Sequence, residues 1–504
     1  MSYLNKNQLI IDVLRNRRRS TDIAVIYEET RLSYKELYEK VETLGNNIIG
    51  KIKNLEKPVH NIALFIDNSI DYIMGYFIIQ YVGCTVVPID VNVTRLELEN
   101  ILDFCDVHIV ITNNEYEEYI ANLESPVTLI NINRYDNLCN THDLETINDI
   151  FPVSYEDTAI LIQTSGTTGA PKFVMLSHEN ILSNAAAIIE HLGINSKDKT
   201  LIVLPLRLSC NTSQMITHML VGGTVVIHKG DFSAQQVIDE IIYHGITNTS
   251  MVPPMLYLLQ TVSIKKFNQI TAMRFICYSG CKTNNKVIEK LSNKLSNVDL
   301  IETYGLTEAG PRVCNIFPFE KTNHKNAVGQ PMHSVQVKII ENSHQLAANT
   351  LGEIIVKSKG VMKGYYKNIS ATENCLKDGW LYTGDIGYLD SENYLYIIGR
   401  KKNIINCGGN KLSPEEVESV LLELDFICEV YVYSEQHEIL CEIPIADVIF
   451  FENTHIEQKL QSIQQHCKER LSKYKIPRKI NIVKEIMHNK NGKIVRHQNK
   501  TRNN

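Results

Sequence analysis

A run of glycines and hydroxyl residues that ends in a lysine is the segment of this chain best suited to bind phosphate. It follows the apolar stretch 159–162. Its residues are Thr164, Ser165, Gly166, Thr167, Thr168, Gly169, Ala170, Pro171 and Lys172. Glycines let backbone N–H groups approach an anion, hydroxyls add donors, and a lysine adds positive charge. The run therefore predicts a loop that holds nucleotide phosphates, although an ordinary surface loop has a similar composition.

The spacing within this run differs from the pattern of the common NTPase loop. Gly166 precedes Lys172 by six positions, but Pro171 stands where the second glycine belongs, and Phe173 follows the lysine in place of Ser or Thr. We therefore do not expect a motor or switch NTPase.

Four further motifs follow the loop in a fixed order. They are Tyr-Gly-Leu-Thr-Glu at 304–308, Trp-Leu-Tyr-Thr-Gly-Asp at 380–385, Gly-Arg-Lys-Lys-Asn at 399–403 and Asn-Gly-Lys-Ile-Val-Arg at 491–496. Each motif alone is weak, but the ordered set resembles the adenylate-forming superfamily of acyl-CoA synthetases, aryl and amino-acid adenylation domains and beetle luciferases. Further stretches that agree lie at 250–254, 329–331, 352–354, 364–366 and 408–418. The resemblance covers nearly the whole chain.

The resemblance implies an ATP-dependent enzyme that activates a carboxylic acid. The carboxylate attacks the α-phosphate, which yields an acyl-adenylate and pyrophosphate, and the acyl group then passes to a thiol. Such a catalyst works mainly by aligning the reactants and neutralising developing charge. The implied cofactors are ATP, Mg²⁺ and coenzyme A. Two alternatives stay open: delivery of the acyl group to a separate phosphopantetheinyl carrier protein, and a catalytically silent nucleotide-binding regulator.

The resemblance also assigns roles to the Tyr-Gly-Leu-Thr-Glu motif. Glu308 is expected to bind Mg²⁺, because this cation is typically held by one or two carboxylates together with phosphate oxygens. Thr307 would donate to the α-phosphate, and Tyr304 would stack against adenine. Without the resemblance, the same string also fits a turn with a helix-capping threonine.

The next two motifs are expected to bind ribose and to join two domains. Asp385 would accept the ribose hydroxyls, and Arg400 would lie beside the ribose. The hinge about which a small C-terminal domain rotates would fall on Lys402. On local pattern alone, 383–385 also fits a β-turn and 400–403 an exposed hairpin loop.

The residues after the hinge are expected to serve both half-reactions in turn. Lys493 would neutralise the carboxylate and the α-phosphate during adenylation, since an ammonium on a flexible stem can reach both. Gly408 and Gly409 would let a pantetheine arm pass close to the backbone. Most lysines in polar C-terminal loops are simply solvated, and a Gly-Gly pair can simply turn the chain.

The acid itself is not identified by the sequence. Relatives often carry a histidine or aromatic residue within the segment that corresponds to 204–211, and members that activate amino acids carry an aspartate there; neither is present. An unpaired buried ammonium would be costly, so an ordinary α-amino acid is a poor candidate. Ser209 or Asn211 would form a hydrogen bond with a hydroxyl or amide of the acid. Alternatively, either residue is a polar core residue whose hydrogen bonds are satisfied within the fold.

The elements that position these motifs indicate an α/β fold. β-Branched runs such as 109–112, 201–204 and 224–227 alternate with helical patterns at 99–102 and 234–243. A chain of 504 residues is too long for a single hydrophobic core, so two or more domains are expected. The resemblance implies a large N-terminal domain of stacked α/β subdomains at 1–399 and a small, mobile α+β domain at 400–504.

Composition narrows the class further. The formal charge of −6 gives no reason to expect a nucleic-acid partner, and the twelve cysteines include no C-x-x-C pair, which fits a reducing cytoplasm. The uncharged segment 72–89 is long enough to raise the question of a membrane span. Glycine, glutamine and proline interrupt it, so we expect a buried helix that ends near Gly83 and a strand at 85–87 instead. The oligomeric state is not predicted.

Overall fold

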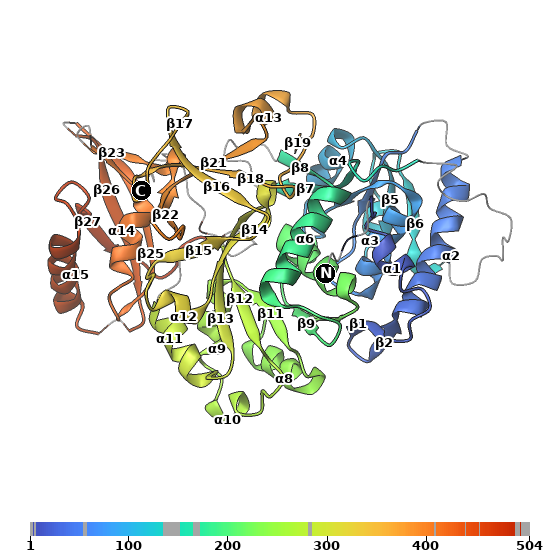
Figure 1. Ribbon diagram of the computed structural model, residues 1–504, viewed down its shortest axis with the longest axis horizontal. Coiled ribbons are helices and arrows are strands. Elements are labelled where there is room, and N and C mark those ends of the chain that lie inside the picture. The colour runs from blue at the N-terminus through green and yellow to red at the C-terminus, as the bar shows by residue number, and fades with distance from the viewer. Residues whose placement is uncertain are drawn as a thin grey trace.

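The computed structural model describes residue 4 and residues 7–53, 58–134, 152–164, 172–280, 285–407, 410–438, 440–452, 454–488 and 494. The chain forms a large N-terminal α/β domain of packed sheets and a small C-terminal domain (Figure 1). The α/β class and the large-plus-small arrangement expected from the sequence are therefore confirmed.

A mainly parallel sheet forms one layer of the N-terminal domain. Its order is β19-β8-β7-β4-β3-β5-β6; the strands from β7 to β6 are parallel, and β8 pairs antiparallel with both β7 and β19 at one edge. The strands are β3 (Asn61–Leu64), β4 (Thr85–Pro88), β5 (Val107–Thr112), β6 (Thr128–Asn131), β7 (Thr158–Thr164), β8 (Lys172–Ser177) and β19 (Gly364–Tyr365). The strand predicted at 109–112 is part of β5. Parallel strands buried on both faces read as continuous apolar runs, which explains why β5 was detectable by composition.

A second mainly parallel sheet lies beside the first. Its strands are β1 (Ile23–Tyr27), β2 (Thr30–Ser33), β9 (Lys199–Ile202), β10 (Thr224–Ile227), β11 (Asn248–Met251), β12 (Phe275–Tyr278), β13 (Asp299–Leu306), β14 (Gly310–Ile316) and β15 (Ala327–Pro331). The order β13-β12-β11-β9-β10-β1 is parallel throughout, whereas β14 and β15 run antiparallel at one end. The predicted strand at 224–227 is confirmed, and the one at 201–204 begins two residues earlier.

An antiparallel extension continues from β15 towards the C-terminal domain. It consists of β16 (Gln336–Glu341), β17 (His344–Gln345), β18 (Gly352–Lys357), β20 (Leu376–Lys377), β21 (Trp380–Leu389) and β22 (Leu395–Arg400). This extension carries the Gly-Asp and Gly-Arg motifs on neighbouring strands.

The C-terminal domain has a sheet of its own. Its strands are β23 (Ile405–Cys407), β24 (Asn410–Leu412), β25 (Ile427–His437), β26 (Cys441–Phe450) and β27 (Lys479–Ile482), and its helices are α14 (Pro414–Leu421) and α15 (Ile456–Arg470). A single 3₁₀ turn, Lys401–Asn403, joins β22 to β23.

Helices cover the sheets of the N-terminal domain (Figure 1). They are α1 (Asp12–Arg15), α2 (Tyr34–Lys53), α3 (Ile70–Val82), α4 (Arg95–Phe104), α5 (Glu117–Ala121), α6 (His178–Leu192), α7 (Ser209–Val221), α8 (Ala234–His244), α9 (Pro253–Leu259), α10 (Ile264–Phe267), α11 (Asn285–Lys294), α12 (Pro318–Lys321) and α13 (Ile369–Cys375). Further 3₁₀ turns occupy Ile132–Arg134 and Thr307–Ala309.

The apolar segment at 72–89 is a core element of this domain. Helix α3 ends at Gly83, which adopts a left-handed conformation with φ +82°, and β4 follows directly. Gly83 can adopt this φ without steric cost because it lacks a Cβ. Nearly every residue of α3 is buried, so the prediction of a buried helix followed by a strand is confirmed.

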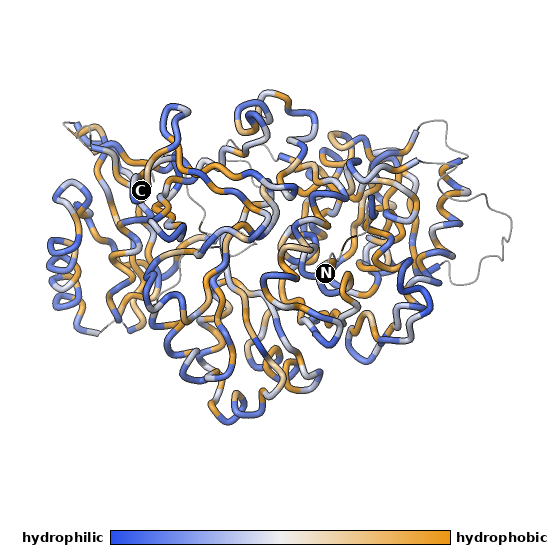
Figure 2. Tube along the Cα trace, viewed as in Figure 1, coloured by the Kyte–Doolittle hydropathy of each residue, from blue (hydrophilic) through white to orange (hydrophobic). Residues whose placement is uncertain are grey.

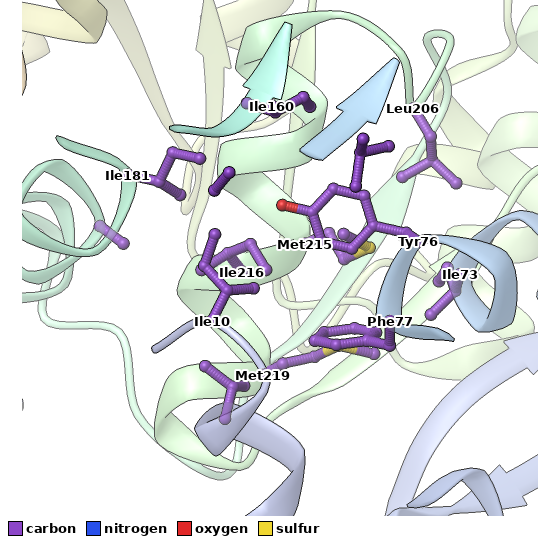
Figure 3. Packing of buried hydrophobic residues seen from close by; sticks show 14 of the residues in the cluster. Ile10, Ile73, Tyr76, Phe77, Ile160, Ile181, Leu206, Met215, Ile216 and Met219 are labelled. Atoms are coloured by element: carbon purple, nitrogen blue, oxygen red, sulfur yellow. The ribbon is translucent and has the colours of Figure 1, made fainter. Parts of the chain in front are cut away.

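The main core joins α3, α6 and α7 with the strands of both parallel sheets. Ile73, Tyr76 and Phe77 of α3 lie against Met215 and Met219 of α7 (Figure 3). Apolar residues concentrate on the strands and on the inner faces of the helices, whereas α15 is largely hydrophilic (Figure 2). Helix α7 therefore lies deep in the molecule.

The two domains touch at more than the connecting turn. Ser413 donates to the carbonyl of Ile398 at 3.0 Å, and Tyr257 of α9 stacks on Phe451 with ring centroids 5.7 Å apart. Lys286 of α11 forms an ion pair with Asp425. The C-terminal domain thus rests against α9 and α11 in this conformation.

Candidate active site

The turn between β13 and β14 presents Thr307 and Glu308. β13 ends at Leu306, the 3₁₀ turn occupies Thr307–Ala309, and β14 begins at Gly310. Gly310 has φ +86°, and a Cβ at this position would lie 2.8 Å from the side chain of Asn184. Only glycine fits here without displacing α6, so the shape of the turn depends on this residue.

Glu308 belongs to a chain of contacts that ends at Lys172. The hydroxyl of Tyr365 donates to Glu308 Oε1 at 2.9 Å, and Lys172 Nζ lies 4.8 Å from the centre of the Tyr365 ring. Burial and the Glu308 carboxylate raise the pKa of Tyr365 far above its ordinary value, so the hydroxyl stays protonated and remains a donor. The predicted metal ligand and the last residue of the predicted phosphate loop are therefore neighbours.

The two ends of the predicted phosphate loop pair with each other. Thr164 of β7 is opposite Lys172 of β8, and Thr164 Oγ1 donates to the Lys172 carbonyl at 3.4 Å. Residues 165–171 therefore connect antiparallel neighbours, although Ser165, Gly166, Thr167, Thr168 and Gly169 lie outside the described residues.

Tyr304, Asp385 and Arg400 form a second cluster. The Tyr304 hydroxyl donates to Asp385 Oδ2 at 2.6 Å, and Arg400 Nε lies 2.6 Å from Asp385 Oδ1. Asp385 and Arg400 face each other in register across β21 and β22, and Arg400 also donates to the Thr383 carbonyl. Burial and the nearby carboxylate raise the pKa of Tyr304 well above its ordinary value. Three residues predicted to bind the nucleoside are thus in direct contact.

Electrostatic interactions link the two clusters. Partial desolvation and the Arg400 cation lower the pKa of Lys402, with a further contribution from Lys172, while Asp385 and Glu415 oppose the shift. Arg400 also lowers the pKa of Tyr365 against the larger effect of burial. Lys402 occupies the turn between the domains, so the predicted hinge lies within the electrostatic field of both clusters.

Of the two residues predicted to line the acyl pocket, only one faces the site. Ser209 Oγ lies 3.1 Å from Thr307 Oγ1 and borders a cavity between α6, α7 and β14. Asn211 is fully buried, donates to the Pro205 carbonyl at 3.1 Å and does not line that cavity. Asn211 therefore stabilises the turn before α7.

Three further predicted site residues, besides those of the phosphate loop, belong to the C-terminal domain. Gly408, Gly409 and Lys493 lie outside the described residues. Their neighbours Cys407, Asn410 and Ile494 are described, and Ile494 forms an isolated bridge with His488. The roles of these three residues stay predictions.

Sequence reasoning missed Tyr365 as a functional residue. The Gly-Tyr-Tyr string at 364–366 was one of the stretches that agreed with the superfamily, but it received no role. Its position in β19, paired with β8, brings its hydroxyl to Glu308. The motif therefore marked Tyr365 as a residue to consider. The sequence did not indicate that Glu308 would be its hydrogen-bond partner.

Replacing Tyr304 by phenylalanine is expected to lower the free energy of unfolding by about 1–3 kcal/mol, because buried Asp385 loses a donor. The measurement is chemical denaturation at neutral pH. Tyr388→Phe on the same sheet is the control, since the Tyr388 ring stacks on Tyr396 at 4.6 Å and its packing would be kept. Equal stability of the two variants would contradict the assigned hydrogen bond.

Comparison with known proteins agrees with this fold and site. A family model described as AMP-binding enzyme matches residues 14–366, and one described as AMP-binding enzyme C-terminal domain matches residues 416–493. A 2-succinylbenzoate–CoA ligase of Bacillus velezensis is 29% identical over 483 residues, which cover 94% of each chain. A ligase with the same name from Bacillus licheniformis is 27% identical over 478 residues, 94% of this chain and 96% of the relative.

Solved structures show the same architecture. The O-succinylbenzoate coenzyme A synthetase of Bacillus subtilis in complex with AMP superposes with a TM-score of 0.84 at 26% identity, covering 98% of this chain and 99% of that chain. An anthranilate CoA ligase in complex with anthranoyl-AMP gives a TM-score of 0.85 at 22% identity, which supports the fold alone.

The fold and the site together define an adenylate-forming enzyme. The chain belongs to the AMP-binding enzyme family. It is an AMP-forming acid–thiol ligase of the acyl-CoA synthetase type, which activates a carboxylic acid with ATP as an acyl-adenylate and transfers the acyl group to a thiol. The alternative of a catalytically silent regulator is thereby disfavoured.

The question of a membrane span has a direct answer in the described part of the chain. None of the helices there combines the length and the apolar character needed to cross a bilayer.

Proposed function

We propose that this enzyme activates 2-succinylbenzoate, or a closely related acid, and transfers it to coenzyme A. Support for this acid comes from the relatives with that name, which match the chain over 94% of its length. The structural observation that supports the adenylation step is that the Lys172–Tyr365–Glu308 chain lies near enough to the Tyr304–Asp385–Arg400 cluster for Arg400 to lower the pKa of Tyr365. These groups would supply cations and the Glu308 carboxylate to the triphosphate of ATP, and the Asp385 carboxylate to its ribose.

The nucleotide would be bound by both clusters. We assign the phosphates to the 164–172 loop with Lys172, the α-phosphate to Thr307, and the ribose to Asp385 and Arg400. Both Asp385 oxygens are bonded, one to Tyr304 and one to Arg400. Binding of ribose would therefore replace or share one of these contacts, and Arg400 is the more exposed of the two partners.

Glu308 fits the requirements of magnesium. Its Oε1 accepts from Tyr365, whereas its Oε2 has no hydrogen-bond partner within the described ranges. Magnesium is typically bound by one or two protein carboxylates together with substrate phosphates, and the same described ranges contain no cluster of three metal-ligating side chains. A single carboxylate suits a magnesium ion that is shared with ATP. The positive charge of the ion would offset the negative charge of the phosphate oxygens. The B. subtilis enzyme has been solved with ATP and a magnesium ion.

The first half-reaction joins the acid to AMP. A carboxylate oxygen of the acid attacks the α-phosphorus, and the bond from phosphorus to the bridging oxygen of pyrophosphate breaks. Lys493 would offset the charge of the carboxylate and the phosphate as they approach. Ser209 and Thr307, whose hydroxyl oxygens are 3.1 Å apart, lie where the acid would meet the nucleotide.

The second half-reaction transfers the acyl group. The thiol sulfur attacks the acyl carbon, AMP leaves, and the thiol proton is released. We propose that residues 400–504 rotate about Lys402 between the two steps and that Gly408 and Gly409 then border the path of the pantetheine arm. The 3₁₀ turn at Lys401–Asn403 is suited to such a hinge, because few residues would need to change conformation.

We further propose a cytoplasmic location. Among the described cysteines no disulfide is formed, which agrees with a reducing compartment.

The test of this function supplies the purified protein with ATP, Mg²⁺, 2-succinylbenzoate and coenzyme A. We expect equimolar AMP and an acyl-CoA thioester, detected by mass. Parallel reactions replace coenzyme A by holo carrier proteins, and a reaction without any acid is the control. Thioester on a carrier protein alone, or no acid-dependent AMP, would contradict the proposal.

A further inference from the structure

The glycine of the Gly-Arg motif lies in contact with the C-terminal domain. Gly399 is buried near the end of β22, where it pairs with Ile386 of β21. A Cβ at Gly399 would lie 2.0 Å from Ser413 Oγ and 2.3 Å from Glu415 Oε2. The φ of Gly399 is not left-handed, so an alanine could adopt the same backbone conformation. The glycine is therefore needed for the space beside the strand, and not for the shape of the strand.

Ser413 and Glu415 come from the start of α14 and hold each other in place. Ser413 precedes the helix and is 3% exposed. Its hydroxyl is 2.6 Å from Glu415 Oε2 and 3.0 Å from the carbonyl oxygen of Ile398, and its single hydrogen is shared between them. Glu415 Oε1 accepts from Asn403 Nδ2 at 2.6 Å. The carboxylate is thus fixed at both oxygens and presents Oε2 to Gly399.

The residues on the two sides of Lys402 are bonded to different domains. Lys401 pairs with Glu353 of β18 at 2.7 Å, whereas Asn403 is bonded to Glu415 of α14. A rotation about Lys402 would therefore leave both of these contacts intact. It would separate the end of β22 from the start of α14, and so it would break the contact with the glycine.

The arrangement of the domains in this structure suits the first half-reaction and not the second. Residues 408–409, which we assign to the path of the pantetheine arm, follow Cys407 at the end of β23. β23 lies at the margin of the C-terminal domain, away from β14 (Figure 1). Acyl transfer would therefore require another position of this domain, in which the start of α14 no longer contacts Gly399.

We propose that Gly399, Ser413 and Glu415 form a domain seat, which holds the C-terminal domain in the position used for adenylation. Gly399 is a positioning residue: it acts through the position of the domain and not through contact with the substrates. Its missing side chain lets α14 approach β22. The inference rests on the proposed domain rotation, and it assigns the domain seat to the first half-reaction alone.

A methyl group added at residue 399 would act on one position of the domain only. Contacts of 2.0 Å and 2.3 Å are far too short for non-bonded atoms, so Ser413 and Glu415 would have to move away. The carboxylate is held by two charge-assisted hydrogen bonds, and turning it aside would break them. After the rotation, the start of α14 would no longer face the methyl group. The substitution would therefore shift the population of domain positions without changing a binding residue.

The first test measures the two half-reactions of Gly399→Ala separately. Exchange of pyrophosphate into ATP with 2-succinylbenzoate reports adenylation, and acyl transfer from synthetic acyl-adenylate to coenzyme A reports the second step. Exchange is expected to fall by about 10- to 100-fold, the effect typical of a methyl group forced into filled space. Transfer should stay within about threefold of the wild type or become faster. The KM for ATP should not change, because the residues assigned to ATP are kept.

The matched control is Gly387→Ala in the neighbouring strand β21. A Cβ there would lie 2.2 Å from the carbonyl oxygen of Tyr396, and both residues belong to the N-terminal domain. This strain is the same in every position of the C-terminal domain. The variant should therefore have a lower thermal unfolding midpoint, and its two half-reactions should be affected equally. Equal losses in the two half-reactions of Gly399→Ala would overturn the proposal.

A second experiment removes the atoms that the methyl group would meet. The double variant Ser413→Ala/Glu415→Ala deletes both oxygens, and its exchange rate is expected to be about 3- to 10-fold lower than that of the wild type. Adding Gly399→Ala to this background should slow exchange by less than about threefold, because the two changes act on one contact. A full loss in this background would show that the methyl group disturbs β22 itself, and it would contradict the domain seat.

A third measurement needs no substrate. Lys401 and Lys402 are exposed beside the domain seat, and trypsin cleaves after lysine. Limited digestion of the full-length protein, followed by mass analysis, reports the rate of cleavage at these two lysines. This rate is expected to be about 3- to 10-fold higher in Gly399→Ala and unchanged in Gly387→Ala, because only the first releases the C-terminal domain. Equal rates in Gly399→Ala and the wild type would overturn the proposal.

The domain seat and the proposed function fail in different ways. If the wild type forms acyl-adenylate but no thioester on coenzyme A, the proposed acceptor is wrong. In that case, slower exchange and faster tryptic cleavage in Gly399→Ala still support the domain seat. If the wild type completes both half-reactions and Gly399→Ala slows them equally, the domain seat is wrong and the acid–thiol ligase stands.

Discussion

Lys493→Ala is expected to slow acyl-adenylate formation by about 10²- to 10³-fold, the loss typical when a group that stabilises transition-state charge is removed. The ammonium would act only while the carboxylate and the α-phosphate approach each other. Thioester formation from a preformed acyl-adenylate should therefore stay within about threefold of the wild type. Pyrophosphate exchange measures the first step, and acyl transfer from synthetic acyl-adenylate to coenzyme A measures the second.

The control for this variant is Lys484→Ala, which changes an exposed lysine of the same domain and should affect neither step. Equal loss in both half-reactions would contradict a role confined to adenylation. A lower thermal unfolding midpoint in Lys493→Ala, but not in Lys484→Ala, would indicate a structural role instead.

Glu308→Gln is expected to reduce pyrophosphate exchange by about 10²-fold and to shift the Mg²⁺ dependence to higher concentration, because an amide oxygen is a weaker ligand for a hard cation than a carboxylate. Glutamine has the same shape and can still accept from the Tyr365 hydroxyl, which is 2.9 Å from Glu308 Oε1. The fold should therefore be kept. Exchange is measured over a series of Mg²⁺ concentrations at saturating ATP.

Tyr365→Phe is the matched variant for Glu308. It removes the hydroxyl but leaves the carboxylate and the aromatic ring that Lys172 contacts at 4.8 Å. The rate of pyrophosphate exchange is expected to fall by about 3- to 10-fold, because one hydrogen bond is lost. If Glu308→Gln had the same Mg²⁺ dependence as the wild type, Glu308 would not be the metal ligand.

Contacts between the domains bear on the proposed rotation. The Lys286–Asp425 pair, the Tyr257–Phe451 stack and the Ser413 hydrogen bond must all break if the C-terminal domain turns. An exposed ion pair contributes about 0–1 kcal/mol, and an aromatic pair about 0.5–1.5 kcal/mol beyond burial. These contacts are weak enough for the domain to exchange between positions during turnover.

Much of the fold could be predicted from local sequence. The α3–β4 unit was identifiable because its apolar run is interrupted at Gly83, where the chain must turn. Strand β10 and helix α8 followed from β-branched composition and helical periodicity. The ends of β9 were shifted by two residues, because strand ends depend on pairing with β10 and β11.

The candidate site could be predicted only in part. The motifs identified Tyr304, Asp385 and Arg400, and the structure brings the three into contact. Tyr365 was missed because its role depends on the pairing of β19 with β8. Asn211, at the start of α7, points to the turn before the helix, where it donates to the Pro205 carbonyl.

The sequence by itself determined the chemistry that the chain can offer: a loop of glycines and hydroxyls, carboxylates in two glycine-containing motifs, and the alternation of strands and helices that implies an α/β core. These properties are local, because backbone preference and periodicity act over a few residues. Only the tertiary structure decided which side chains meet. Lys172, Glu308 and Tyr365 come from three distant segments and meet only after the strands that carry them have packed. Such contacts depend on how separate surfaces fit together, which spacing along a chain does not encode.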